Sequence, residues 1–304
     1  MLTSEQKDQR RQGIGGSDAA AIAGVSRYKT AVDVYLEKLG YQDSDIDNEA
    51  IYFGNVLEPI VAEQYALRNG VQLAESERIV SKHHPHMFAN VDRLIIGGNA
   101  VLECKTTSLY NANRWGVQET DDIPPEYLLQ CAHYRIVTDC AYVAIAVLIG
   151  GQEYRQYRYD KNTALEEQLI ALERKFWYEN VLAKVPPEPQ TFSDALNLFK
   201  EPITGPKTAD EDCVVFLRNY RQTLYDIKTL ETDAEVFKTR LARYLGNDTE
   251  LINEGGDTLA TWRPRKMARF DLAAFRKEHP DLYKQFTKTT TTRDFKLKRQ
   301  SSYE

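Results

Sequence analysis

Three charged residues in the stretch NVDRLIIGGNAVLECKTTS have the types and spacing needed to bind a divalent cation. Glu103 and Lys105 lie two residues apart in an apolar, strand-like run, so their side chains leave the same face of a strand and their neighbours point to the other face. Asp92 precedes a short hairpin, IIGGNAV, that can return Glu103 to its side. Two carboxylates and a lysine on adjacent strands could hold a hard cation and an activated water. The alternative is an exposed, salt-bridged hairpin.

A second stretch, RRQGIGGSDAAAIAG, places three glycines in four positions, which indicates a close approach to the backbone. A dinucleotide site is not favoured, because no hydrophobic strand precedes Gly13 and the third glycine comes too early for G-x-G-x-x-G. Ser17 is a good N-cap for a short helix, and Arg10 or Arg11 could reach the same turn, a combination that binds anions. The alternative is an ordinary tight turn with an N-cap.

Two further groups of polar residues are candidate ligands. Glu58 shares a helix face with Val61 and Tyr65, and a carboxylate beside apolar residues needs a cation or hydrogen-bond donors. The alternative for Glu58 is a capping box with Asn55, with Pro59 in the first helical turn. The histidines of KHHPHMF are not predicted to bind a metal, because an extended strand interrupted by proline cannot bring all three together.

The elements that position these residues alternate between helix and strand, which predicts a mixed α/β body. Helices are predicted for AVDVYLEKL after Thr30, for the segment that ends at RNG, for EYLLQCAHYRIVT and for TALEEQLIALERKFWYENVLA. Strands are predicted for VQLAESERIV, MFANVDRLII, AVLECKTTS, AYVAIAVLIG and YRQYRYD.

The 304 residues allow one large domain with an extension, or two modest domains. Four cysteines without a C-x-x-C pair predict reduced thiols and no structural zinc. No segment resembles a membrane span or a signal peptide, which predicts a cytoplasmic protein. The net charge is −6, yet residues 261–304 carry +7 and the remainder carries −13, so the tail suits a polyanion or an acidic partner.

The predicted organisation has three parts: residues 1–186 as the core, 187–208 as a proline-containing linker, and 209–304 as a C-terminal extension. The extension begins with a long helix and continues with a basic strand-helix-strand segment. Apolar residues of that helix recur at steps of four and three, a stripe that we expect to pack on the body or on a neighbouring subunit: Cys213, Leu217, Tyr220, Leu224, Ile227, Leu230, Ala234, Phe237 and Leu241.

The pattern of Asp92 followed by Glu103-Cys104-Lys105 resembles the D…E-x-K core of the PD-(D/E)XK nucleases. Its surroundings, GIGGSDAAAIAGVSRYKTAVDVYLEKLG, FGNVLEPIVAEQYA, FANVDRLI, LECKTTS and EYLLQCAHY, occur in the order typical of the YqaJ-type viral recombinases, relatives of phage lambda exonuclease. The resemblance covers about residues 10–160, and the C-terminal segment also resembles the extension of YqaJ proteins. It implies a restriction-endonuclease-like α/β core with a central mixed sheet of about five strands flanked by helices.

The resemblance also implies a role for each matching residue. Asp92, Glu103, Glu58 and the carbonyl of Cys104 would hold Mg²⁺, for which Mn²⁺ would substitute, and Lys105 would orient or deprotonate the attacking water.

Gln130 matches a helix glutamine beside the active site of the family. Arg11 and Ser17 match an arginine and a serine that bind the 5′-phosphate, and Arg10 is a rival to Arg11 because this chain is one residue shorter there.

The function implied is a Mg²⁺-dependent 5′-to-3′ exonuclease that acts on double-stranded DNA ends and leaves 3′ single strands for phage-type recombination. The implied partners are duplex ends and a single-strand annealing protein, with a trimeric ring as the assembly and the cytoplasm of a phage- or prophage-bearing bacterium as the location. Two alternatives remain: a non-catalytic protein that binds DNA ends as a scaffold, and a sequence-independent endonuclease.

Overall fold

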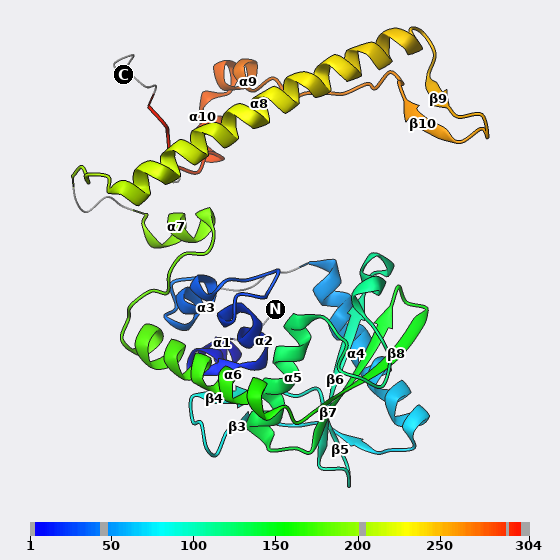
Figure 1. Cartoon of the computed structure of the whole chain (residues 1–304), viewed down its shortest axis with the longest axis vertical. Coiled ribbons are helices and arrows are strands. Elements are labelled where there is room, and N and C mark those ends of the chain that lie inside the picture. Colours follow the sequence, from blue (N-terminus) through cyan, green and yellow to red (C-terminus); the bar gives the residue numbers. More distant parts are fainter. Residues whose placement is uncertain (1–3, 43–47, 201–204, 290–291, 299–304) are drawn as a thin grey trace. The chain divides into compact units, whose positions relative to one another are not determined.

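The computed structural model describes residues 4–42, 48–200, 205–289 and 292–298. The chain divides into two units, residues 1–200 and 201–304 (Figure 1). The first unit holds all the predicted site residues, and the second holds the predicted long helix and the basic segment.

A five-stranded mixed sheet is the centre of the first unit, with helices on both of its sides (Figure 1). Its strands, in spatial order, are β2 (Leu73–Ala74), β5 (Arg93–Ile95), β6 (Ala100–Thr107), β7 (Tyr142–Ile149) and β8 (Glu153–Asp160). Strands β6 and β7 are parallel, and the other neighbours are antiparallel. The run YVAIAVLI is apolar along almost its whole length because β7 is covered on both faces. The predicted mixed α/β core is confirmed.

The hairpin between β5 and β6 sets the position of the acidic residues. Ile95 pairs with Ala100, and the turn between them contains Gly97 with φ of 77° and Asn99 with φ of 41°. Glycine and asparagine adopt such left-handed conformations more readily than other residues, so the sequence GGN closes the hairpin as predicted.

Each face of the sheet packs on one helix that the sequence predicted. Helix α4 (Glu49–Asn69) contributes Val61, Ala62 and Tyr65 to a cluster with Leu102 and Cys104 of β6. Helix α5 (Pro125–Thr138) packs on the other face, where the buried cluster includes Val101, Cys131, Ala132, Val143 and Ile145. Glu103 therefore points toward α5, while its two neighbours point toward α4.

The remaining elements of the first unit are a small second sheet and several further helices. This sheet has the order β1 (Ile14–Gly15), β4 (Met87–Ala89) and β3 (Ile79–Val80). The other helices are α1 (Ser4–Arg11), α2 (Gly16–Ile22), α3 (Ala31–Lys38), a 3₁₀ helix (Leu109–Arg114), α6 (Thr163–Lys175), a π-helical segment (Phe176–Leu182) and α7 (Phe192–Leu198).

The glycine-rich turn is required by contacts inside the protein. A Cβ atom at Gly13 would lie 2.7 Å from the carbonyl oxygen of His86, and one at Gly16 would lie 2.5 Å from the ring of Tyr134. Gly15, rather than Ser17, is the N-cap of α2, so the predicted cap is wrong by two positions. The glycines allow α2 to approach β4 and α5 closely.

Two predicted strands are each divided between the two sheets. VQLAESERIV gives β2 and β3, and MFANVDRLII gives β4 and β5, because the chain passes from one sheet to the other at residues 75–78 and 90–92. The predicted linker also differs, since α7 lies within residues 187–208. Its Asp194 is 1% exposed and accepts a hydrogen bond from the hydroxyl of Thr30 at 2.8 Å.

The second unit contains one long helix, α8 (Glu211–Leu245), as predicted. It is followed by β9 (Glu250–Ile252), β10 (Thr258–Thr261), α9 (Leu272–Glu278) and α10 (Pro280–Gln285). The predicted strand-helix-strand pattern is wrong in two respects: the helix is interrupted at Pro280, and residues 292–298 form no strand. Most of the apolar stripe of α8 is exposed, including Leu230 and Phe237.

No helix of the described segments is both long and apolar enough to cross a membrane.

Candidate active site

Asp92, Glu103 and Lys105 meet at the point where β6 extends beyond β5. The pairing of β5 with β6 stops at Arg93 and Leu102. Just beyond this pair, the amide of Cys104 donates a hydrogen bond to the Asp92 carboxylate at 2.7 Å instead of to a strand carbonyl. Glu103 is 1% exposed and contacts the ammonium group of Lys105. The amide and carbonyl of one strand residue point the same way, so the Cys104 carbonyl lies on the Asp92 side.

The two carboxylates carry more negative charge than their surroundings balance. Burial and the neighbouring charge of Glu103 raise the pKa of Asp92 to about 8, although Lys105 opposes the shift. One carboxylate oxygen of Glu103, Oε2, is buried without a hydrogen-bond partner among the described residues. Burial alone would lower the pKa of Lys105, but the neighbouring charges of Glu103 and Asp92 outweigh burial and raise this pKa. A site with this excess of buried oxygen ligands favours a cation.

Gln130 of α5 lies directly above this pair. Its side-chain amide donates a hydrogen bond to Glu103 Oε1 at 2.7 Å and lies 2.8 Å from the hydroxyl of Tyr134. That hydroxyl donates to the carbonyl of Asn90 at 3.0 Å. The network connects α5 to the segment that carries Asp92 and restrains Glu103.

Glu58 lies at the edge of the site, where it has a partner in the protein. Its carboxylate accepts a hydrogen bond from the guanidinium of Arg93 at 2.9 Å, and its charge contributes to the raised pKa of Asp92. Helix α4 starts after its N-cap Asn48, so Pro59 lies inside the helix and the capping-box alternative at Asn55 is wrong. No three His, Cys, Asp or Glu side chains of the described segments form a group that could hold a metal. The acidic centre is thus a pair of carboxylates with a backbone carbonyl beside it.

A cavity of about 180 Å³ is lined mainly by residues of the glycine-rich turn. Its lining residues are Arg10, Gly15, Gly16, Ser17, Asp18, Phe88, Asn90 and Tyr134. Tyr134 contacts Gln130, which in turn contacts Glu103, so two side chains connect this cavity to the carboxylate pair. We call this cavity the end pocket.

The structure places Arg10, rather than Arg11, in the end pocket. The guanidinium of Arg10 donates a hydrogen bond to the Ser17 hydroxyl at 3.3 Å, whereas that of Arg11 donates to Asp8 at 3.2 Å. The ammonium group of Lys38 donates to the carbonyl of Arg10 at 2.8 Å and thereby fixes the end of α1.

Asp18, which lines the end pocket, forms a buried ion pair with Lys38. Their charged atoms are 2.6 Å apart, and their side chains are 2% and 1% exposed. Burial alone would raise the pKa of Asp18, but Lys38 and Arg10 outweigh it and lower the pKa to about 2. Asp18 also accepts a hydrogen bond from the amide of Gly15 at 3.0 Å, so it shapes the turn as an anion. Residue spacing did not point to Lys38, because it belongs to a different helix.

His84 and His86 of the histidine cluster pack in a row of rings with Tyr178. His86 is buried against the ring of Tyr178, with ring centroids 5.4 Å apart, and burial lowers its pKa to about 4. His84 lies 6.2 Å from it, ring centroid to ring centroid.

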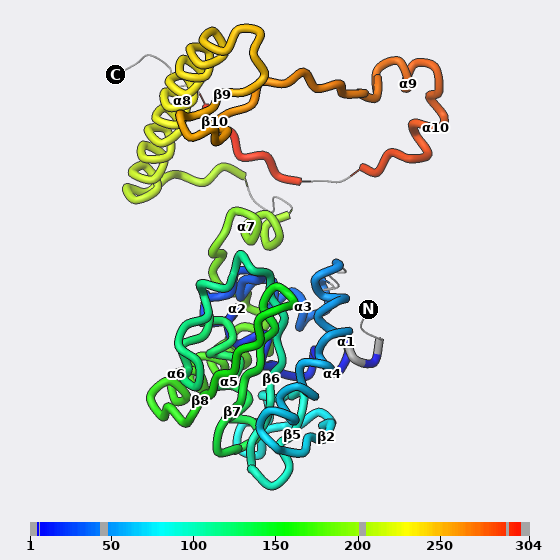
Figure 2. The backbone as a smooth tube through the Cα atoms, turned by 90° about the vertical axis from the view of Figure 1, so that its right-hand side faces the viewer, coloured from blue at the N-terminus to red at the C-terminus, as the bar shows by residue number. Residues whose placement is uncertain are grey.

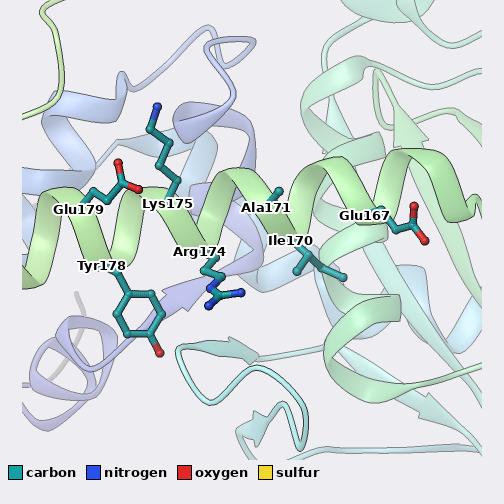
Figure 3. Close-up of a pocket in the computed structure, with 7 residues that line it drawn as sticks. All are labelled: Glu167, Ile170, Ala171, Arg174, Lys175, Tyr178 and Glu179. Carbon is teal, nitrogen blue, oxygen red and sulfur yellow. The ribbon is translucent and has the colours of Figure 1, made fainter.

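A larger hollow of about 600 Å³ runs along α6, bordered by acidic, basic and apolar side chains: Glu167, Ile170, Ala171, Arg174, Lys175, Tyr178 and Glu179 (Figure 3). Figure 3 shows Lys175 and Tyr178 pointing to opposite sides of the helix, so these side chains do not converge on one point.

Comparisons with known proteins agree with the motif order. Residues 5–141 match the YqaJ-like viral recombinase domain. The YqaJ protein of Bacillus subtilis (strain 168) is 32% identical over 307 residues, which cover 98% of this chain and 95% of the relative. Among solved structures, an alkaline exonuclease from Laribacter hongkongensis (LHK-Exo) is 16% identical with a TM-score of 0.48 and covers 60% of this chain and 94% of its own. A phage-related exonuclease from Haemophilus somnus 129PT is 13% identical with a TM-score of 0.45. The match covers 57% of this chain and 96% of that exonuclease. The chain belongs to the YqaJ family of viral recombinases, as the order of its motifs predicted.

Proposed function

We propose that this protein is a metal-dependent DNA exonuclease that degrades the 5′-terminated strand at duplex ends and leaves a 3′ single strand. The observation that carries the proposal is the pair of half-buried Asp92 and buried Glu103, which has one lysine beside it and one carboxylate oxygen without a partner among the described residues. A protein that only bound DNA would gain nothing from two carboxylates facing phosphates, because like charges repel.

The donor set fits a hard divalent cation. Asp92, Glu103 and the Cys104 carbonyl would hold it, and Glu58 would join if its contact with Arg93 opened. We assign Mg²⁺, with Mn²⁺ as a substitute, because both prefer oxygen ligands. When bound, the ion supplies charge to the scissile phosphate and acidity to a coordinated water.

Lys105 and Gln130 have separate tasks in this proposal. The ammonium group of Lys105 contacts Glu103, so it lies beside the cation site, where it would orient or deprotonate the attacking water. Gln130 holds Glu103 through one oxygen and leaves Oε2 for the cation. The Cys104 amide fixes Asp92 in the same way.

The end pocket supports an exonuclease over an endonuclease. Arg10 and the Ser17 hydroxyl offer two donors to a terminal 5′-phosphate, and the pocket is closed toward the interior by Tyr134. Cleavage in the middle of a duplex needs no such pocket. Membership of a recombinase family supports a role in recombination, with an annealing protein as partner, a ring-shaped homo-oligomer as assembly and the host cytoplasm as location.

A comparison of linear and closed DNA tests the proposal. With Mg²⁺, the protein should release nucleotides from duplexes labelled at the 5′ end and leave covalently closed circles intact. The variants Asp92→Asn and Glu103→Gln should lose this activity but still bind duplex ends, while Asp121→Asn, at an exposed position, should remain active. Cutting of closed circles would indicate an endonuclease. Full activity in Glu103→Gln would refute the assigned site.

A further inference from the structure

A short basic segment of the second unit, Trp262–Phe270, links β10 to α9 (Figure 2). Its sequence is WRPRKMARF, with four cations and no acidic residue. It forms no helix or strand, and all nine residues are exposed. Arg263 contacts Glu250, while Arg265, Lys266 and Arg269 form no ion pair with any described residue.

Large side chains lie at both ends of this segment and remain accessible. Trp262 is 50% exposed and Phe270 is 70% exposed. The amide of Trp262 donates a hydrogen bond to the carbonyl of Thr249 at 2.8 Å, and the ring of Phe270 contacts that of Phe275 with centroids 4.9 Å apart. Both aromatic residues are therefore anchored, with the basic chain extended between them.

We propose that the segment Trp262–Phe270 binds single-stranded DNA, with Trp262 and Phe270 stacking on bases and the intervening cations neutralising phosphates. Flat aromatic side chains stack on any unpaired base, and a row of cations follows the backbone. In a duplex the bases already stack on one another and offer no free face to these two rings. The segment also forms neither the helix nor the paired β-ribbon that the major groove admits. An acidic protein would satisfy the cations but would leave the two exposed rings without a role.

This inference extends the proposed function, because the single strand would be the 3′ strand that the exonuclease leaves behind. It nevertheless concerns binding alone and needs neither metal nor hydrolysis. A binding assay in EDTA therefore succeeds or fails independently of the nuclease activity.

The chain contains its own reporter for this test. Of its three tryptophans, Trp115 and Trp177 are 3% and 8% exposed, so Trp262 is the one that a ligand can reach. Titration of the full-length protein with an oligothymidylate in EDTA should quench the fluorescence of Trp262. A hairpin duplex with the same number of phosphates should quench it much less, and polyglutamate should not quench it.

Matched variants separate stacking from charge. Trp262→Ala or Phe270→Ala should weaken binding of the single strand by about 5- to 100-fold. Phe286→Ala, which removes a ring that is 79% exposed outside the segment, should have no effect. The pair Arg265→Gln and Lys266→Gln should reduce the slope of log affinity against log salt by about 1.4, since a single strand releases about 0.7 counterion per neutralised phosphate. The control pair Lys277→Gln and Lys284→Gln should leave the slope unchanged.

Three outcomes would overturn the proposal. Single-strand binding without quenching of Trp262 would place the site elsewhere. Equal quenching by the hairpin duplex would mean that unpaired bases are not recognised. Quenching by polyglutamate, with an unchanged affinity in Phe270→Ala, would indicate an acidic protein partner.

Discussion

The end pocket predicts that the protein distinguishes 5′-phosphate from 5′-hydroxyl ends through Arg10. Replacing Arg10 with alanine removes the guanidinium that contacts Ser17, while Arg11→Ala removes one that contacts Asp8. The two adjacent arginines thus form a matched pair of variants.

The magnitude follows from the exposure of Arg10. A hydrogen bond to a charged group contributes about 1.5–3 kcal/mol. The Arg10 side chain is 28% exposed, so solvent screens part of this and we take the lower end of the range. Because 1.4 kcal/mol corresponds to tenfold, Arg10→Ala should lower the preference for phosphorylated ends about tenfold. Ser17→Ala removes a neutral donor and should lower it about two- to fivefold.

The assay is a single-turnover digestion of two otherwise identical duplexes, one with 5′-phosphate ends and one with 5′-hydroxyl ends. Wild type and Arg11→Ala should both prefer the phosphorylated duplex, and Arg10→Ala should degrade the two at similar rates. Thermal unfolding must show that each variant is folded, since Arg10 also lies 3.9 Å from Glu37. If wild type digests both duplexes equally, the pocket does not bind the terminal phosphate. If only Arg11→Ala loses the preference, the geometric assignment to Arg10 is refuted.

The site, the buried ion pair and the basic tail give four further expectations. Lys105→Ala should slow nucleotide release at least ~10²-fold, which is the effect expected when a group that stabilises charge in the transition state is lost. The melting temperature should change little. If the rate falls by only a few fold, Lys105 takes no part in the chemistry. Gln130→Leu should slow release by about tenfold, because Glu103 loses a hydrogen-bond donor, and single-turnover rates with wild-type duplex binding would check this. Asp18 has its pKa lowered from 3.8 to about 2 in the folded state, so it should add about 2 kcal/mol to the free energy of unfolding above pH ~4, a contribution lost as the pH falls toward 2; urea unfolding of wild type and Asp18→Asn at several pH values should show this slope in wild type alone. Deleting residues 261–304, which carry +7, should leave turnover on saturating short duplexes unchanged and flatten the salt dependence of DNA binding; an unchanged slope would indicate that the tail contacts a protein instead.

Local sequence determined those features that depend on the period of one element or on one turn. The alternation of β6 places Glu103 and Lys105 on one face and their apolar neighbours on the other, because successive strand residues point in opposite directions. The glycines and asparagine of GGN close the hairpin, and α5 starts at Pro125, one residue before the predicted Glu126. The order of motifs identified the family, because each motif is a short stretch of sequence that can be recognised without knowing the tertiary structure.

Only the tertiary structure decided which residues from different elements meet. Arg10 rather than Arg11 lines the end pocket because Lys38, which belongs to another helix, holds its carbonyl. Glu58 faces Arg93 because the hairpin register brings that residue beneath α4, a contact between positions 35 residues apart in sequence.

The glycines of the N-terminal turn illustrate the same division. Their density correctly indicated a close approach to the backbone, but the atoms that approach belong to His86 and Tyr134 of the protein itself. Spacing along the chain determines which face a side chain occupies. What it contacts depends on how elements pack, and packing free energy is shared among many residues far apart in the sequence.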